Sequence, residues 1–401
     1  MERFHLSGVL DPECNVQFGE GGAGAFSDGK LTTGIKDPRC RLVLETFRDH
    51  GAPEEILYLA RPHIGTDRLP GVIGSIRREI ESLGGEVRFS ARLTGIEADG
   101  GRLRAIRVLE NGAEWEAECR SMVLAVGHSA ADTQGMLFDA GMDMRQKPFS
   151  AGFRIEHPQK MINAAQYGAS ASWALLPPAE YHLSAHLPSG RGVYTFCMCP
   201  GGQVVGAASR EGGVCVNGMS PYLRDGENAN AAVLADVRPE DFPDAHPLSG
   251  YVLQRLWEER AFRLGGSDYR APAMKAGDFL ARRASGDLGG LLTPTCRPGV
   301  TPSDLREALP EWLLEDLRQA LGIFDRQLIG FAHPEAVITG VETRSSCPVR
   351  HVRFGGGESS IGGVWTAGEG AGCAGGIMSA AVDGIRCAED LLDRFREGYA
   401  K

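Results

Sequence analysis

The spacing of apolar residues changes several times along the chain, and each change predicts a different kind of element. Residues 39–50 and 53–61 show the spacing of short amphipathic helices, and residues 70–83 show that of a longer helix with one buried face. The pair Gly84-Gly85 ends this third helix, because glycine readily adopts the left-handed conformation found at helix ends. The first part of the chain is therefore predicted to be mainly helical.

Strand patterns follow the third helix. Alternating or β-rich segments occur at 86–89, 91–98, 103–110 and 114–119, and glycine turns separate the last three. These last three segments predict a three-stranded antiparallel meander.

A continuous apolar run at 121–129 predicts a strand that is buried on both faces. The run contains Gly127 near its end, and a helix is expected to begin at Ala131. In α/β folds, ligands bind at such carboxyl ends of strands. We therefore expect a ligand to contact the backbone at Gly127.

The composition and the predicted elements change between residues 148 and 340, where proline is more frequent and the strand patterns are shorter. Helices are predicted there at 252–263 and 302–322, which together with the strands indicate an inserted α+β domain. Residues 341–401 resemble the first part of the chain again, because they contain a short strand, a glycine turn and a helix at 377–394. The fold class predicted is α/β, with residues 1–147 and 341–401 forming one domain around the insertion.

Composition adds a pointer to ligand loops. Glycine makes up 54 of the 401 residues, which is above the usual share of ~7%. The glycines gather at 19–34, 200–213 and 355–376. Loops of this kind bring backbone N–H groups close to a ligand, although glycine content alone is also typical of a plain mobile loop.

Charge and cysteine usage narrow the function classes. The net charge of −10 gives no support for nucleic-acid binding. We find no signal peptide and no apolar run of ~18 residues, so no membrane association is expected. The ten cysteines have no C-x-x-C spacing, which favours a reduced, cytoplasmic protein without a metal site.

Three features occur in order along the chain: a glycine loop, a buried strand that ends in L-A-V-G at 124–127, and the turn Gly368-Glu369-Gly370 before a final helix. Residues 124–127 resemble the "ATG" motif of two-dinucleotide-fold flavoproteins, with valine in the usual threonine position. The acidic turn resembles the second acidic motif of the same proteins, with glutamate where aspartate is commoner.

Longer segments narrow this resemblance. NVQFGEGGAGAFSDGKL at 15–31, FRIEHPQ at 153–159, ETRSSCPVR at 342–350 and AGEGAGCAGGIMSAAVDGI at 367–385 resemble the uncharacterised FAD-dependent dehydrogenases, which are NAD(P)/FAD-dependent oxidoreductases with a glutathione-reductase-like fold. The resemblance covers essentially the whole chain. It implies an FAD-binding Rossmann-like domain interrupted by a substrate domain.

The resemblance also implies which residues bind FAD. The Glu369 carboxylate would hydrogen-bond a ribityl hydroxyl, and the N–H groups at the start of the last helix would face the flavin pyrimidine edge, where a helix N-terminus stabilises negative charge. Leu93 would meet the adenine. The full set is Gly21, Gly22, Gly24, Ser27, Leu93, Gly127, Gly368, Glu369, Gly375, Gly376 and Ile377.

The chain departs from the family pattern at its beginning. The family carries an N-terminal strand–turn–helix with a G-x-G-x-x-G motif, and no such unit is found here, so we expect an N-terminally truncated domain. Two function classes follow. One is an FAD-dependent oxidoreductase of unknown small-molecule substrate, with NAD(P)H as a possible transient reductant; the other is a fragment with weak or no FAD binding and no catalysis.

Catalytic residues are less well defined. His128, at the end of the buried strand, is either an acid or base near the flavin or a residue that caps and packs the strand end. Cys197 and Cys199 are expected to face the same side of a strand. Redox chemistry and ordinary buried cysteines are both open for this pair, and no basic neighbour is visible in the sequence.

Arg154 and Arg344 lie at the two crossovers between the predicted domains, together with Glu156 and His157. Flavoprotein active sites lie at such junctions, which makes these residues candidates for substrate contact. An interdomain salt bridge is the alternative for each of them.

Overall fold

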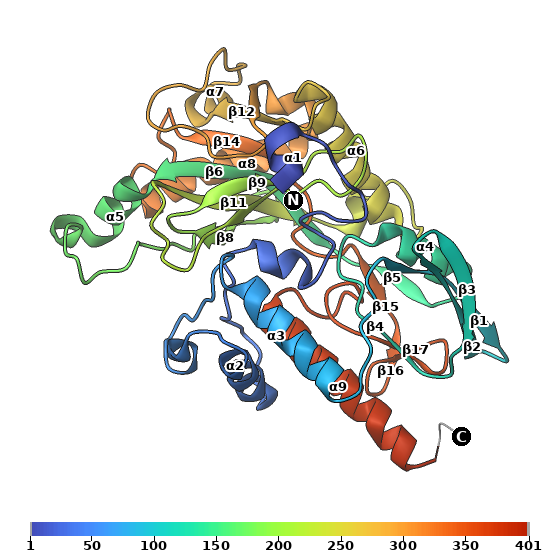
Figure 1. Ribbon diagram of the computed structural model, residues 1–401. Helices are drawn as coiled ribbons and strands as arrows, with labels where there is room; N and C mark the ends of the chain where they lie inside the picture. Colours follow the sequence, from blue (N-terminus) through green and yellow to red (C-terminus); the bar gives the residue numbers. More distant parts are fainter. Residues whose placement is uncertain (1, 399–401) are drawn as a thin grey trace.

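The structure is a computed structural model that describes residues 2–398, and it has a mixed α/β fold with a large sheet (Figure 1). The helices are α1 Glu2–Ser7, α2 Arg39–Asp49, α3 Leu69–Ser82, α4 Ala131–Asp139, α5 Gln159–Tyr167, α6 Ser249–Leu264, α7 Ala276–Leu280, α8 Glu311–Gln327 and α9 Ile377–Arg396. The strands are β1 Ala91–Asp99, β2 Arg102–Glu110, β3 Ala113–Glu118, β4 Met122–Leu124, β5 Met144–Gln146, β6 Phe149–Pro158, β7 Ser184–His186, β8 Gly192–Cys199, β9 Gln203–Gly206, β10 Val216–Met219, β11 Asn228–Val237, β12 Ala271–Lys275, β13 Val300–Pro302, β14 Val337–Glu342, β15 Val349–His351, β16 Arg353–Phe354, β17 Glu358–Ser359 and β18 Val364–Thr366.

The largest sheet in the described part of the chain has seven strands in the order β13-β12-β14-β6-β11-β8-β7. Strands β6 and β11 pair antiparallel along their whole length, from Asn228 opposite Pro158 to Val237 opposite Phe149. Every residue of β6 is buried, so both faces of this central strand are covered.

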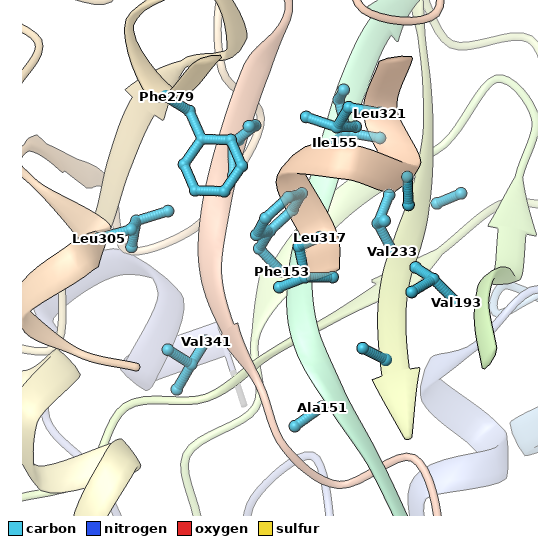
Figure 2. Packing of buried hydrophobic residues seen from close by; sticks show 14 of the residues in the cluster. Ala151, Phe153, Ile155, Val193, Val233, Phe279, Leu305, Leu317, Leu321 and Val341 are labelled. Carbon is cyan, nitrogen blue, oxygen red and sulfur yellow. The ribbon is translucent and has the colours of Figure 1, made fainter. Parts of the chain in front are cut away.

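Helix α8 covers one face of the sheet because its apolar residues recur at helical spacing. Leu317 and Leu321 of α8 lie over Phe153, Ile155 and Val233 of the central strands (Figure 2). Each fully buried side chain of this size contributes ~2 kcal/mol to folding.

The opposite face of β6 carries polar side chains that are nevertheless buried, among them Ser150, Arg154 and Glu156. The hairpin of β9 and β10 lies against this face, and a Cβ atom added to Gly218 of β10 would lie 2.2 Å from Nη1 of Arg154. Because this second layer excludes water, the polar residues must find hydrogen-bond partners inside the protein.

The predicted meander is confirmed: β1, β2 and β3 form an antiparallel sheet in that order. The strand predicted at 86–89 is wrong, because Ser90 adopts a left-handed turn (φ 53) that separates these residues from β1. The helix predicted at 53–61 is wrong in its extent, because only the 3-10 turn Glu54–Leu57 forms there.

The helix predicted at 302–322 begins later than expected. Pro302 ends strand β13, and Pro310 precedes α8, which starts at Glu311. Proline is well tolerated just before or at the first helical turn but not inside a helix, so the two prolines fix this boundary.

Strand β4 pairs in parallel with β18 at one end of a four-stranded sheet ordered β16-β17-β18-β4. The prediction that this strand is buried on both faces is wrong, because Val123 is 38% exposed. One face packs on the core that contains Leu103, Leu124 and Val364, while solvent reaches the other face of this short end strand.

Helices α2, α3 and α9 share a separate core, in which Val43, Val72 and Val382 are buried. The helices predicted at 39–50, 70–83 and 377–394 correspond to them and are confirmed. Within residues 2–398, no helix combines the length and the apolar character needed to cross a bilayer.

Candidate functional site

Two glycine turns meet at the carboxyl ends of β4 and β18. Gly127 follows β4 with φ 70, and Gly368 follows β18 with φ 74, so both occupy the left-handed region that favours glycine. A Cβ atom on Gly370 would lie 2.6 Å from the carbonyl oxygen of Gly127. The parallel pairing of the strands thus brings the two predicted turns together, at a distance that only glycine permits.

The first glycine loop lies against the start of α9. A Cβ atom on Gly24 would lie 3.4 Å from Cγ1 of Ile377, and Gly21 and Gly22 both have positive φ. The Ser27 hydroxyl donates to the Gly24 carbonyl at 2.7 Å and accepts from the N–H of Gly29 at 3.0 Å, which holds the loop in shape. The structure therefore brings together Gly24 and Ile377, which are more than 300 positions apart in the sequence.

Residues 19–24 carry the letter pattern G-x-G-x-x-G, but their structure is not a strand–turn–helix unit. The 3-10 helix Gly22–Phe26 occupies this stretch, and helix α1 and turns precede it in the described residues. This loop therefore offers backbone groups without the long helix that completes a dinucleotide fingerprint.

The N-terminus of α9 is open to solvent. Gly375 and Gly376 are exposed, no side chain caps the helix, and the Ala380 N–H makes the first helical bond, to the carbonyl of Gly376. The N–H groups before Ala380 point out of the helix end, where the helix dipole is positive. This end of α9 can hold a negatively charged or strongly polar group.

The Glu369 turn lies beside the first turn of α9, since a Cβ atom on Gly368 would lie 3.7 Å from Cβ of Ala380, and the Glu369 carboxylate accepts no hydrogen bond from the described residues. Burial raises the pKa of Glu369 to about 7, and the positive charge of Lys147 opposes this rise. The turn itself is anchored, because Asp383 of α9 accepts from the N–H of Gly368 at 2.7 Å and pairs with Arg353 at 2.8 Å. A fixed, desolvated carboxylate without a donor is suited to a ligand that brings a hydroxyl group.

Side chains of helices α6 and α4 hydrogen-bond the turns that follow β4 and β18. Tyr251 of α6 donates to the carbonyl of His128 at 2.8 Å and lies 3.2 Å from Sγ of Cys347. Gln134 donates to the Gly370 carbonyl at 2.8 Å. Because the bonds to His128 and Gly370 end on backbone carbonyls, side chains from distant elements help to fix the positions of the turns.

His128 is packed at the strand end. Its Nε2 lies 3.3 Å from the amide nitrogen of Gln254, and its Nδ1 lies 3.3 Å from the Ser129 hydroxyl. Burial, with the neighbouring charge of Arg344 acting in the same direction, lowers the pKa of His128 to about 3. The imidazole is therefore neutral at physiological pH, and it does not carry the second proton that a general acid would donate.

Arg344 links the two parts of the fold. It forms a two-pronged ion pair with Glu258 of α6, at 2.8 and 2.7 Å, and also donates to Ser129 at 3.1 Å and Ser209 at 2.5 Å. Both partners of the ion pair are almost fully buried. Of the two sequence alternatives for Arg344, this geometry is that of a salt bridge that also touches the turn after β4.

Arg154 is different, because it is fully buried inside the seven-stranded sheet. It pairs with Glu342 of the neighbouring strand at 2.6 Å and donates to Asn230 at 2.7 Å. Glu156 likewise accepts from Thr295 at 2.6 Å and is closed off from solvent. The structure thus places Arg154 in an ion pair within one sheet and away from any accessible surface.

The expected arrangement of Cys197 and Cys199 is wrong. Strand β8 has a register shift opposite β11 between Asn230 and Ala232, and Cys197 adopts φ 42, so Cys197 is exposed while Cys199 is buried. Such a bulge breaks the alternation on which the same-side expectation depends. Arg154, which the sequence did not reveal as a neighbour, lies 4.0 Å from Sγ of Cys199.

Both cysteines are free thiols. Desolvation by the surrounding protein raises the pKa of Cys197 to about 12 even though its side chain reaches solvent, with Arg154 acting in the opposite direction. Within the described residues, no group of three or more His, Cys, Asp or Glu side chains is arranged to hold a metal ion.

Leu93, the residue expected to meet an adenine, lies in β1 opposite Val108. Its side chain is half-buried against the core that contains Ile96 and Leu124.

Sequence reasoning missed several residues that shape this region. Lys147, Asp383 and Glu258 act through partners that are far away in the sequence, so no local pattern reveals them. Arg210 lies within the glycine cluster at 200–213, which was a signal that its loop lines a site.

Comparison with known proteins gives a family match over the middle of the chain. Residues 148–345 match the family described as FAD-dependent protein, C-terminal domain-like. An uncharacterized protein of Clostridium beijerinckii is 48% identical over 397 residues, which cover 98% of this chain and 74% of that protein.

Two solved structures are more distantly similar. A mutant of the E. coli quinol fumarate reductase FrdA is 11% identical with a TM-score of 0.38, and covers 88% of this chain and 55% of its own. An oxidoreductase from Methanosarcina mazei is 13% identical with a TM-score of 0.28, and covers 80% of this chain and 54% of its own. The chain thus spans about half the length of these two proteins.

FAD is the cofactor that the family match assigns, and the described residues fit it. The unpartnered Glu369 carboxylate suits a hydroxyl-bearing chain, and the open N-terminus of α9 suits a polar ring edge. Gly127 and Gly370 approach each other closely and carry no side chains. No side chain of these two residues therefore stands between their peptide groups and a ligand beside the Glu369 turn and the N-terminus of α9.

Proposed function

Because the chain belongs to one family with the Clostridium beijerinckii protein and its residues 148–345 match a domain of FAD-dependent proteins, we propose that it is an FAD-dependent oxidoreductase that acts on a small molecule. The observation that carries this proposal is the juxtaposition of the Glu369 turn, the glycine loop at 19–29 and the uncapped start of α9. In the described residues these three features offer an acidic acceptor, bare backbone and a positive helix end in one place.

Each feature has a role in this proposal. The Glu369 carboxylate accepts a hydrogen bond from the ribityl chain, and the N–H groups at Gly376 and Ile377 orient the ring system and favour negative charge on it. Gly24 and Gly127 allow the backbone to approach closely. When bound, FAD supplies the group that accepts electrons from one molecule and passes them to another.

Two residues set the protonation state around the site. His128 stays neutral, and its contact with Gln254 helps to hold the turn after β4 in position. Lys147 donates to Ser346 and to the carbonyl of Cys347 at 3.3 Å, and its charge favours the ionised form of Glu369. Because its imidazole is neutral, His128 is not assigned the role of a proton-donating acid.

We further propose a glutathione-reductase-like arrangement in which 1–147 and 341–401 bind FAD and 148–340 shape the substrate side. Arg344 and Glu258 form the buried pair at this junction. The substrate remains a small molecule of unassigned identity, with NAD(P)H as a transient reductant.

Flavin absorbance tests the proposed function. The chain is mixed with FAD, passed through a gel-filtration column and examined for the visible absorbance of bound flavin, and then NADH or NADPH is added without oxygen. Bleaching of the bound flavin by either nucleotide supports the proposal, with dithionite as the control for full reduction. A chain that releases all its FAD on the column contradicts it.

A further inference from the structure

A second arginine lies beside the Arg344–Glu258 pair, and its own ion pair with Glu258 is a long one. Arg210 is in the loop between β9 and β10, and its Nη2 is 3.8 Å from Oε2 of Glu258, which is too far for a hydrogen bond. Its guanidinium makes no hydrogen bond to any residue in the described part of the chain. The side chain is 32% exposed, so a molecule from solvent can reach it.

Glu258 cannot neutralise both arginines. Its Oε1 already accepts from Arg344 at 2.8 Å and from Thr343 at 2.7 Å, and its Oε2 accepts from Arg344 at 2.7 Å. Arg255, another positive residue of α6, is paired with Glu259 on the surface. The cluster of Arg210, Arg344 and Glu258 therefore carries one uncompensated positive charge.

The environment of Arg210 makes that charge costly. Burial lowers the pKa of Arg210, and Glu258 opposes this effect. A partly desolvated guanidinium with five free donors gains most from a planar anion that takes two of its N–H groups at once.

The position of Arg210 connects it with the flavin side of the molecule. Arg344 donates both to Ser209, the neighbour of Arg210, and to Ser129, which follows the β4 turn. Ser129 in turn donates to Gln17 at 3.2 Å, just before the first glycine loop. An anion held by Arg210 would thus lie at the junction of the cofactor turns and the seven-stranded sheet.

We propose that Arg210 binds the carboxylate of an anionic substrate, with the buried Arg344–Glu258 pair and the hydroxyls of Ser129 and Ser209 forming the back of the site. This inference deepens the proposed function and rests on it for the statement that the bound anion is a substrate. It assigns a chemical class, small carboxylates, to a substrate that was otherwise unassigned.

Succinate is the probe for this site. Its dissociation constant is measured by calorimetry on the flavin-free chain at constant ionic strength, and the neutral analogue succinamide is measured in parallel. We expect succinate to bind and succinamide not to bind. Arg210→Gln should weaken succinate binding by about ten- to a hundredfold, the usual effect of losing hydrogen bonds to a charged group.

Two matched variants control this measurement. Arg255→Gln removes a positive charge from the same region but leaves Arg210 in place, and it should change the dissociation constant by less than about twofold. Arg210→Lys keeps the charge without the planar fork and should fall between the wild type and Arg210→Gln. Unfolding midpoints of the variants show whether each is folded.

Three results would overturn the proposal. The first is succinamide binding as tightly as succinate, and the second is Arg210→Gln binding succinate as well as the wild type does. The third is FAD loading that abolishes succinate binding while Arg210→Gln releases FAD, which would assign Arg210 to the phosphates of the cofactor. The proposed function is tested by a different measurement, the retention and reduction of FAD. Because succinate binding is measured on the flavin-free chain, a failure of FAD binding does not affect that result.

Discussion

Replacing Glu369 with glutamine should stabilise the flavin-free chain while weakening its hold on FAD. The carboxylate is desolvated and accepts no hydrogen bond from the described residues, so its charged form is disfavoured in the folded state. Glutamine keeps the shape of the side chain and removes the charge. Both effects have the same cause: the buried carboxylate lowers the stability of the flavin-free chain and is available to hydrogen-bond FAD.

The size of the effect follows from the pKa. Burial raises the pKa of Glu369 from 4.5 to about 7, and one pKa unit corresponds to about 1.4 kcal/mol. The folded state binds this proton more tightly than the unfolded state, so the free energy of unfolding falls as pH rises from about 4.5 to 7, by about 3 kcal/mol in all. Glu369→Gln should therefore match the wild type near pH 4 and exceed it by up to about 3 kcal/mol at pH 8.

Urea unfolding followed by tryptophan fluorescence, repeated from pH 4 to pH 8, measures this difference. Glu240→Gln, at an exposed position in a surface turn, is the matched control and should run parallel to the wild type. If the curves for Glu369→Gln and the wild type stay parallel over the whole range, the carboxylate is not desolvated as described and the reasoning fails.

Three further substitutions test other parts of the structure. Arg154→Met leaves Glu342 buried without its partner and should lower the free energy of unfolding by about 3–5 kcal/mol in urea; a loss below 1 kcal/mol would mean that the pair is solvated. Gly370→Ala places a Cβ atom 2.6 Å from a backbone oxygen and should destabilise the chain and reduce FAD retention, whereas Gly384→Ala in α9 meets nothing within 4 Å and should raise the unfolding free energy by about 0.5–1 kcal/mol. Because the pKa of Cys197 is about 12, iodoacetamide should label it at pH 8 much more slowly than it labels a short unstructured peptide thiol, as followed by mass spectrometry; equal rates would refute the raised pKa.

Local patterns in the sequence were sufficient for elements whose own residues determine them. The apolar spacing of 70–83 predicts α3, since helix amphipathicity is a property of one segment, and the helix expected after the glycine turn, at 377–394, corresponds to α9. Gly127 was expected at a strand end and 368–370 in a turn, and both Gly127 and Gly368 adopt the left-handed backbone that favours glycine.

Features that depend on distant partners could not be predicted in this way. The bulge at Cys197 arises from pairing with β11, and the exposure of Val123 follows from the position of β4 at the end of its sheet. The partner of Arg154 could not be predicted either, because Glu342 lies 188 positions away in the sequence and meets Arg154 only through the pairing of β14 with β6. The charge left over at Arg210 emerges only when Glu258 is seen to be occupied by Arg344.

The central claim is that FAD lies between the glycine loop at 19–29 and the turn at 368–377. Hydrogen–deuterium exchange with and without saturating FAD tests it most directly, because a bound ligand slows local opening of the backbone that it contacts. We predict slower exchange at 19–29, 124–131 and 368–380 and no change at 287–302, in the far loop of the substrate side. Protection confined to other segments, or none at these three, would contradict the account.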